Sequence, residues 1–567
     1  MWCVVLVWVL CVSLSCSSRP NIVLVVADDL GIGSVKTRQS VRLGHWSDMG
    51  GAASPVTTPQ LEALSANGLV FERMYTNSPI CSASRYALLT GIGTGSKWSR
   101  VRGNTGESEG DQSLLSNGER TFVQLLRGSG YATAAFGKFG FLEPPSQAGF
   151  EYYLGTRSHK DSYHYFPYAL SEERGDGVVR KTRAYTLNNS NFNVPLAEAM
   201  GLARESRVCN NFYETRRMSQ CQYAPEVVHL ESLRWVASAR EPFFLYYASQ
   251  IPHDSGYNGK ANVTRVGPVP SYDGRSRPSP NSRCATCRNY ESELRSGRYT
   301  ATMANVGSAV TNHFDRYVGE LVSALSRKGV LDNTLVIVTS DNGPSNKLAR
   351  DIAGQRGILD APLNSNGPFT GFKRQLYEGS LRLPNLFLWG SRFSGAPTSK
   401  LAVQVSDLAP TLLDLAGVAI PRQFTGISFA NVLRGQPQTQ AHAYLYSEIC
   451  QLDKGVLGKH SSCDFVVAFG DNLQYRAEWT TRKPGEEMLW TSIRDGGPQT
   501  AYVTYEGNTT KAKLNFRANV RFSPIVRNID ADITETSNFY TAQLCEQAEA
   551  IAIAVRTVPL PGETIPL

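Results

Sequence analysis

The chain has 567 residues, too many for one simple core, so its length predicts one large domain and a smaller one. Apolar residues make up 41% of the chain and charged residues 19%, which is typical of a globular protein and excludes an intrinsically disordered one. The net charge of +8 is mild and fits an anionic partner or substrate, or equally a solvated basic surface. We expect no nucleic-acid partner.

The N-terminus, MWCVVLVWVLCVSLSCSSRP, is an apolar run that ends in small residues. It predicts a signal peptide over residues 1–18, although the run is not preceded by Lys or Arg, and a membrane-anchoring helix is the alternative. No later stretch reaches the roughly 20 apolar residues of a membrane span. We therefore expect an exported protein with no stable span after signal removal, in an extracellular, lysosomal or periplasmic compartment depending on the host.

The NIVLVVADD run from Asn21 to Asp29 predicts a central parallel strand that is buried on both faces. Helix and strand patterns then alternate: PQLEALSANG with LVFERMYT, TFVQLLRGSG with YATAAFGKFG, PEVVHLESLRWVASA with PFFLYYAS, and Val306–Leu325 with NTLVIVTSDNG. This alternation predicts a doubly wound, mostly parallel α/β sheet with helices on both faces, in a domain over residues 19–435.

After Gly435 the segments become shorter and richer in β-formers, as in FVVAFGDNLQYRAEWTT, MLWTSI and QTAYVTYEG. They predict a smaller C-terminal α/β subdomain with an antiparallel sheet over residues 436–567. The stretch from Tyr257 to Arg298 is rich in Arg, Ser, Pro and Gly, and we interpret it as a loop that overhangs a site.

The eleven cysteines fit an oxidising compartment only in part. Two pairs are close enough in sequence to form disulfides: Cys209 with Cys221 and Cys450 with Cys463. The C-x-x-C pair lacks a second ligand pair for zinc and is either a disulfide or two free thiols: Cys284 and Cys287. Three Asn-x-Ser/Thr acceptors predict a glycoprotein in a glycosylating host: Asn188, Asn262 and Asn508.

Two predicted strands end in oxygen-bearing side chains. Asp28 and Asp29 end the first strand, and Asp341 and Asn342 end TLVIVTSDN. Because ligands gather at the carboxyl ends of strands in open α/β sheets, the four residues predict a cage of hard oxygens for Ca²⁺ or Mg²⁺ rather than zinc. The alternative is that both pairs are simple turn formers.

The segment PICSASRYALLTG places Cys81 in a turn of small residues, four positions before Arg85 and ahead of an apolar helical stretch. The residues alone leave three interpretations open: a buried thiol, a disulfide partner, or a nucleophile that an activating group would have to accompany.

Seven segments occur in one order: RPNIVLVVADDLG, CSASRYALLTG, FGKFG, LGTRSHKDSY, PFFLYYASQIPH, TSDNG and GFKRQLYEGSLRLP. Together they resemble the sulfatases of the alkaline phosphatase superfamily, arylsulfatase-like, from Pro20 to about Gly417. The resemblance implies a sulfuric ester hydrolase. It also implies that a formylglycine-generating maturation enzyme converts Cys81 to formylglycine, whose aldehyde hydrate has two hydroxyls. One hydroxyl attacks sulfur, and deprotonation of the other expels sulfate.

The resemblance also implies roles for the other residues. One calcium ion would be held by Asp28, Asp29, Asp341 and Asn342, with residue 81 completing its shell. Arg85 would pair with the acidic ligands and steady the aldehyde hydrate, the alternative being a helix-surface arginine. Lys138 and Lys373 would neutralise charge on the sulfate and the leaving oxygen, the alternative being solvated lysines. His253 would act as sulfate ligand or general acid, the alternative being a turn residue.

Two positions depart from the family pattern. Ala83 stands where most members have proline, so conversion of Cys81 depends on the host. Gly140 stands where the family has a histidine that contacts the aldehyde hydrate. Ser158 and His159, in the TRSHKD loop, would face the sulfate, and His159 is our candidate to replace the missing histidine.

These departures motivate an alternative from a different class, a catalytically silent sulfatase-like protein that binds sulfated glycans. A phosphatase or phosphodiesterase on the same fold is the other alternative, although such enzymes use Ser or Thr nucleophiles and two metals with histidine-rich shells. The expected substrate is a sulfated small molecule or glycan. The arginines between Tyr257 and Arg298 fit a polyanionic glycan, or equally a solvated loop.

Overall fold

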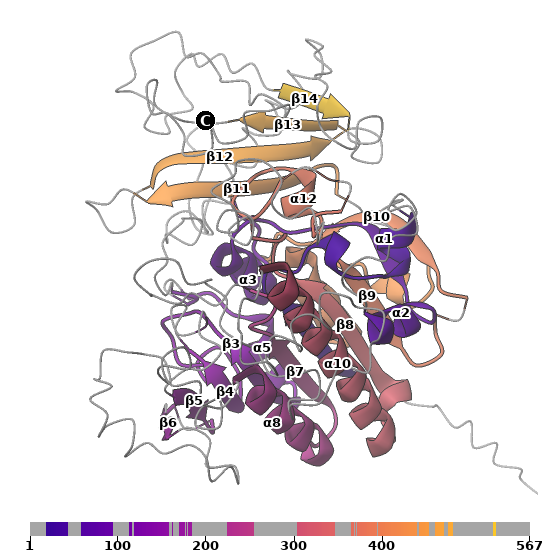
Figure 1. The fold of residues 1–567 in the computed structure, drawn as a ribbon. Helices are drawn as coiled ribbons and strands as arrows, with labels where there is room; N and C mark the ends of the chain where they lie inside the picture. The colour runs from indigo at the N-terminus through magenta and orange to yellow at the C-terminus, as the bar shows by residue number, and fades with distance from the viewer. Residues whose placement is uncertain are drawn as a thin grey trace, which may run out of the picture.

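The computed structural model describes residues 19–42, 58–94, 113–157 apart from 116 and 117, 162, 169–183 apart from 176 and 179, 224–253, 303–345, 365–438 apart from 368, 370 and 394, 442–452, 460–469, 475–479 and 525–528. Figure 1 shows a large α/β layer structure with a smaller sheet stacked at one end. The predicted signal peptide, glycosylation acceptors and arginine-rich stretch lie outside the described residues, as do Cys209, Cys221, Cys284 and Cys287. None of the described helices is long and apolar enough to cross a membrane.

The central sheet has eight strands in the order β6-β5-β4-β3-β7-β1-β8-β9. Their bounds are β1 Asn21–Ala27, β3 Ala132–Lys138, β4 Tyr152–Thr156, β5 Ala169–Glu173, β6 Arg180–Arg183, β7 Phe243–Ala248, β8 Thr334–Ser340 and β9 Asn385–Trp389. The five strands from β4 to β8 in this order are parallel, and β5, β6 and β9 pair antiparallel at the two edges. The predicted mostly parallel α/β sheet is confirmed.

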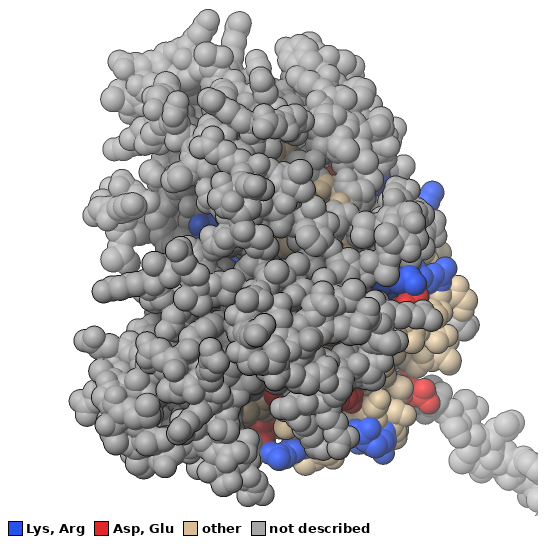
Figure 2. Space-filling view, in the orientation of Figure 1, with Lys and Arg blue, Asp and Glu red and all other residues tan. Residues whose placement is uncertain are grey.

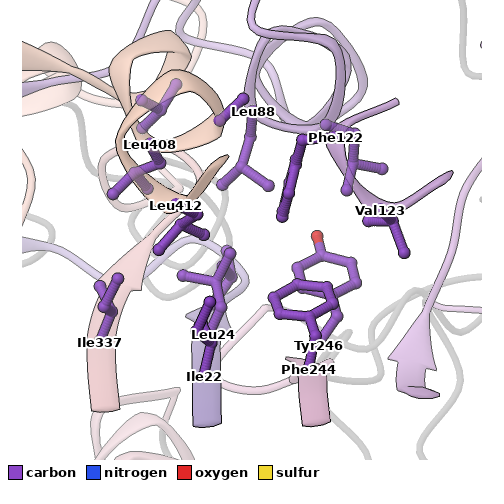
Figure 3. Close-up of a cluster of buried hydrophobic side chains, with 14 of the residues drawn as sticks. Ile22, Leu24, Leu88, Phe122, Val123, Phe244, Tyr246, Ile337, Leu408 and Leu412 are labelled. Atoms are coloured by element: carbon purple, nitrogen blue, oxygen red, sulfur yellow. The ribbon is translucent and has the colours of Figure 1, made fainter. Parts of the chain in front are cut away.

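Both faces of this sheet are covered, because alternate residues of the central strands enter two separate cores. Val23 and Val25 of β1 lie in the first core, under α2 (Pro59–Ser65), α8 (Ala224–Ser238) and α10 (Met303–Lys328). Ile22 and Leu24 lie in the second core, shown in Figure 3, with α3 (Cys81–Thr90), α5 (Phe122–Gly128), α13 (Leu408–Leu415) and α14 (Ala430–Leu433). The shorter helices are η1 Ile32–Ser34, α1 Arg38–Arg42, η4 Leu331–Asn333, α12 Glu378–Leu381 and η5 Val405–Asp407.

One predicted strand lies elsewhere. LVFERMYT does contain β2 (Val70–Tyr75), but β2 pairs in parallel with β10 (Thr398–Gln404) in a two-stranded sheet outside the central one. The physical reason lies in its burial. Glu72 and Arg73 in the middle of β2 are only half-buried, whereas β1, β7 and β8 are buried along their whole length.

The smaller sheet is antiparallel in the order β11-β12-β13-β14, and Figure 1 shows it beyond α12. Its strands are β11 Leu445–Leu452, β12 His460–Phe469, β13 Tyr475–Trp479 and β14 Ile525–Asn528. In the β11–β12 ladder the backbone of Cys450 lies directly opposite that of Cys463, the pair that the sequence suggests. MLWTSI and QTAYVTYEG lie outside the described residues, and the domain boundary near residue 435 stays a prediction.

Charged side chains of both signs lie close together on the described part of the face in Figure 2. Ion pairs also join neighbouring elements of the described chain, as between Lys36 and Glu62 or between Arg316 of α10 and Glu226 of α8. The described part of this face therefore has no large patch of one sign.

Gly137 and Gly128 provide a matched test of the fold. Gly137 has φ of +100°, and an added Cβ would lie 2.0 Å from the carbonyl oxygen of Ala248 on the neighbouring strand. We expect Gly137→Ala to reduce the free energy of unfolding by about 2–4 kcal/mol, from backbone strain and overpacking. Gly128 ends α5 with nothing within 4 Å of an added Cβ, so Gly128→Ala should be neutral or stabilising by up to about 1 kcal/mol. Urea denaturation measures the free energy of unfolding of both variants. Equal changes in the two variants would contradict the strain expected at Gly137.

His442, in the segment before β11, contacts the last residue of η5, Asp407. Its Nε2 lies 2.9 Å from the carboxylate of Asp407, which is fully buried. Burial alone would lower the pKa of His442, but the Asp407 carboxylate outweighs burial and raises this pKa above the usual histidine value of 6.5. A raised folded-state pKa stabilises the protein fully below the unfolded value and loses this contribution as the pH rises through the folded value. We expect the urea concentration at the unfolding midpoint to decrease as the pH rises above about 6.5 in the wild type, and to decrease less steeply in His442→Gln. Equal slopes would show that the pair does not control stability.

Candidate active site

The carboxyl ends of four neighbouring strands carry the polar residues of the site. β3, β7, β1 and β8 are adjacent and parallel, so their carboxyl ends meet at one edge. Lys138 is the last residue of β3, and His253 follows β7 in a short turn. Asp28 follows β1 and Asp341 follows β8, whose last residues pair with each other. Strand order alone therefore brings together side chains from positions 28 to 341.

Cys81 comes to this site from a helix, as the first residue of α3. It is 1% exposed and forms no disulfide. The thiol sulfur and carboxylate oxygens of Asp28 and Asp341 all lie within 4.8 Å of one another. Arg85 lies one helical turn further on the same face of α3, which explains the four-residue spacing.

Arg85 of α3 and Lys138 of β3 pair with the carboxylates of Asp28 and Asp341. Arg85 Nε donates to Asp341 Oδ2 at 2.9 Å, and its Nη2 lies 3.9 Å from Asp28 Oδ1. Lys138 Nζ donates to Asp28 Oδ2 at 2.7 Å. Both cationic side chains are almost completely buried, which excludes the helix-surface arginine and the solvated lysine. These contacts make the buried charges tolerable, because buried ions need partners.

Asp29 has a different set of partners. It has a φ of +62°, which turns its side chain towards β8 and the loop after residue 371. Its Oδ1 accepts from Lys373 Nζ and from Asn342 Nδ2, both at 2.7 Å. Its Oδ2 lies 3.4 Å from His253 Nε2. Lys373 and His253 are both more than nine-tenths buried, so neither is a solvated surface residue.

The cations hold the two aspartates in their charged form. Burial alone would raise the pKa of Asp28, but the positive charges around it, Lys138 foremost, outweigh burial and lower this pKa below 3.8. The same holds for the pKa of Asp29, with Lys373 as the main positive charge. Burial would in turn lower the pKa of Lys138, and Asp28 outweighs that effect and raises it. The site is thus a network of ions rather than of neutral acids.

Three oxygens in the site have no hydrogen-bond partner within the described part of the chain. They are buried and come from two strand ends: Asp28 Oδ1, Asp29 Oδ2 and Asn342 Oδ1. A buried acceptor without a partner costs about 1–3 kcal/mol, and more when charged. A hard divalent cation such as Ca²⁺ or Mg²⁺ takes this set of carboxylate and amide oxygens as ligands and removes that cost. The donor set therefore fits the cation that the sequence predicts.

The structure thus brings nine of the predicted residues together: Asp28, Asp29, Cys81, Arg85, Lys138, His253, Asp341, Asn342 and Lys373. Ser158 and His159 lie outside the described residues. Gly140 has a φ of +77°, in the left-handed region, and its amide donates to the carbonyl oxygen of Arg157 at 2.9 Å. A histidine at this position would be strained, so the glycine belongs to the local backbone conformation.

Sequence reasoning missed Tyr246, whose hydroxyl accepts from Arg85 Nη1 at 3.3 Å. In PFFLYYAS this tyrosine looks like any aromatic residue of a buried strand. The only available signal is that it lies two residues before the end of β7, at the edge where the site forms.

Comparisons with known proteins find one family model and several relatives that cover most of the chain. The family model described as Sulfatase matches residues 20–418. N-acetylgalactosamine-6-sulfatase of Mus musculus is 26% identical over 492 residues, which cover 83% of this chain and 74% of that protein. Arylsulfatase A of Bos taurus is 28% identical over 476 residues, which cover 80% of this chain and 75% of that protein.

Solved structures share the fold. PsFucS1 sulfatase from Pseudoalteromonas sp. aligns with a TM-score of 0.59 and 20% identity, over 94% of this chain and 89% of its own. BT4656 in complex with its substrate D-glucosamine-2-N,6-O-disulfate aligns with a TM-score of 0.56 and 15% identity, over 95% of this chain and 97% of its own.

Proposed function

Because the chain belongs to the sulfatase family and is therefore a sulfuric ester hydrolase, we propose that its nucleophile is a formylglycine made from Cys81 and that one calcium ion activates it. The observation that supports this most is the position of Cys81. Its sulfur lies among carboxylate oxygens of Asp28 and Asp341, beside three buried oxygens that lack hydrogen bonds. This arrangement supports a nucleophile at residue 81 with a hard cation bound beside it.

Asp28, Asp29, Asp341 and Asn342 would hold the cation, with residue 81 next to them. When bound, the cation lowers the pKa of a hydroxyl on residue 81 and polarises a sulfate oxygen. Three carboxylates face three cationic side chains in this site: Asp28, Asp29 and Asp341 with Arg85, Lys138 and Lys373. Their formal charges cancel, so a divalent cation leaves an excess of positive charge that attracts an anionic sulfate ester.

The side chains supply the rest of the chemistry. One hydroxyl of hydrated residue 81 would attack sulfur and pass its proton to the neighbouring carboxylate of Asp28 or Asp341, while the bond from sulfur to the alcohol oxygen breaks and His253 gives that oxygen a proton. His253, now neutral, would take the proton of the second hydroxyl, whose oxygen forms the aldehyde as the bond from residue 81 to sulfate breaks. Addition of water would then restore the hydrate, and the carboxylate would release its proton to solvent. Lys138 and Lys373 stabilise the charge that builds on the sulfate oxygens and on the leaving oxygen. Arg85 orients Asp341 and residue 81.

We propose a sulfated sugar as the substrate, with a formylglycine-generating enzyme as the maturation partner. The similarity to N-acetylgalactosamine-6-sulfatase and to a structure that contains a disulfated glucosamine supports this substrate class. Passage through the secretory pathway follows from the predicted signal peptide and belongs to the same proposal.

The two alternatives predict different behaviour. A silent glycan-binding protein would release no sulfate, and Gly140 is the observation that favours it, because no histidine stands there. A two-metal phosphatase would need a histidine-rich shell. The metal-binding groups found among the described residues contain a single histidine, His253, and this favours the sulfatase.

The test starts from protein isolated from its native host. After trypsin digestion, the mass of the peptide MYTNSPICSASR reports the chemical state of residue 81. We expect an aldehyde or its hydrate, one calcium per chain, and sulfate release from an aryl sulfate that Cys81→Ala lacks. An unmodified thiol in the whole population, with no sulfate release, would overturn the mechanism and favour the silent protein. Two transition metals per chain would favour the phosphatase.

A further inference from the structure

Arg85 contacts the site through a rigid, planar fork of nitrogens that is always charged. Its Nε donates to Asp341, as described above, and its Nη1 donates to the hydroxyl of Tyr246 at 3.3 Å and to the carbonyl oxygen of Lys138 at 3.5 Å. Its Nη2 has no hydrogen-bond partner within the described residues and lies 3.9 Å from Asp28 Oδ1. One nitrogen of the fork thus stays available on the side of the site where the nucleophile and the cation ligands lie.

Tyr246 is itself held firmly. It lies in β7, between β3 and β1, and is 1% exposed. Its ring stacks on Phe150 with centroids 6.1 Å apart and an angle of 16° between the planes. Figure 3 shows its hydroxyl directed off the strand, towards the helix layer that contains Leu88 of α3. Burial raises the pKa of Tyr246, so the phenol keeps its proton and accepts from Arg85 as a neutral oxygen.

A planar group needs two fixed points to define its orientation. The Asp341 carboxylate fixes Nε, but rotation about that contact would still be open to a guanidinium with no second partner. The Lys138 carbonyl, at 3.5 Å, is at the limit of a hydrogen bond and restrains Nη1 weakly. The Tyr246 hydroxyl is the closer of the two partners, and the packed ring behind it makes it the rigid one.

From this geometry we infer that Tyr246 is a positioning residue for sulfate ester hydrolysis, acting through Arg85 by fixing the plane of its guanidinium. The inference rests on the proposed function of the site. The hydroxyl holds Nη2 towards Asp28 and the nucleophile, and it holds Nε in line with Asp341. Tyr246 itself does not touch the reacting atoms.

The neighbouring tyrosine supplies a matched control. Tyr247 is equally buried, but the strand directs it into the other core, where its ring meets His229 at 6.0 Å between centroids. Both Tyr→Phe changes remove one buried hydroxyl from adjacent positions of β7. Only Tyr246→Phe removes a contact with the site.

For Tyr246→Phe we expect kcat on an aryl sulfate to fall about tenfold with KM within about twofold, because misplaced catalytic groups lower kcat more than binding. We expect Tyr247→Phe to keep the wild-type kcat, even if the melting temperature decreases by the same amount in both variants. In an Arg85→Lys background, which lacks the fork, Tyr246→Phe should cause no further loss. Wild-type kcat in Tyr246→Phe, or equal losses in the two tyrosine variants, would overturn the inference.

A second readout does not depend on turnover. Calcium alone is titrated into the cation-free proteins by calorimetry, and Tyr246→Phe should bind it about tenfold more weakly, because an outer contact that orients a ligand carboxylate contributes on that scale. Tyr247→Phe should bind calcium like the wild type. If wild-type protein releases no sulfate, the proposed function fails, and the titration still decides the role of Tyr246. Equal calcium affinity in both variants and the wild type would then refute it.

Discussion

Cys81→Ser will lose steady-state turnover by at least about 10³-fold, since removing a nucleophile in covalent catalysis has effects of this order or larger. The reason lies in the second step. Serine at position 81 has one hydroxyl next to Asp28 and Asp341, and this hydroxyl can attack the sulfur of the substrate. No second hydroxyl remains on the same carbon to expel the sulfate. Rapid-quench kinetics should show a single burst of alcohol, close to one equivalent per site, and then almost no further release.

The control is Cys81→Ala, which has no nucleophile and should show neither burst nor turnover. Intact mass spectrometry after the burst should find sulfate bound to Cys81→Ser and none on Cys81→Ala. Because residue 81 is buried at the start of α3, both small side chains fit without overpacking. Multiple turnovers at the wild-type rate by the serine variant would refute the two-hydroxyl mechanism.

Asp341→Asn will abolish calcium binding at millimolar concentrations and lower kcat by about 10³-fold or more, because it removes a charged ligand next to the nucleophile. It should also destabilise the cation-free protein by about 3–5 kcal/mol, as expected when one partner of a buried ion pair is removed. Asp341 Oδ1 accepts from the amides of Asp29 and Asn342, and Oδ2 accepts from Arg85 Nε. An asparagine has one acceptor oxygen, so its amide nitrogen must face a donor.

The matched control is Asp414→Asn. Asp414 pairs with Arg434 at 2.9 Å, and both side chains are about one-third exposed. The substitution therefore removes the same negative charge at a position outside the site. A surface pair contributes about 0–1 kcal/mol, and calcium affinity should not change. Urea denaturation and calcium calorimetry on both variants measure the two effects. Calcium binding by Asp341→Asn with wild-type affinity would show that the cation site lies elsewhere.

The sequence by itself determined the elements that positioned the site. Six successive apolar residues, IVLVVA, indicated a strand buried on both faces, and β1 is such a strand. Val306–Leu325 has the apolar spacing of α10, with Phe314, Val318 and Leu321 in the core. Since parallel strands present their carboxyl ends at one edge of a sheet, assigning both strands placed Asp28 and Asp341 at that edge, and the pairing of β1 with β8 in the structure then brought them close together. The spacing of Cys81 and Arg85 likewise followed from the helix period.

Only the tertiary structure decided which partners these residues have. The pattern of LVFERMYT does not reveal that β2 pairs with β10, because strand pairing depends on distant residues. The sequence does not reveal either that Lys138 pairs with Asp28 while Lys373 pairs with Asp29. Tyr246 and Tyr247 are adjacent and identical in type, and the period of two sends them to opposite faces. Which of the two meets Arg85 depends on the face that α3 covers, and packing of the whole sheet fixes that face.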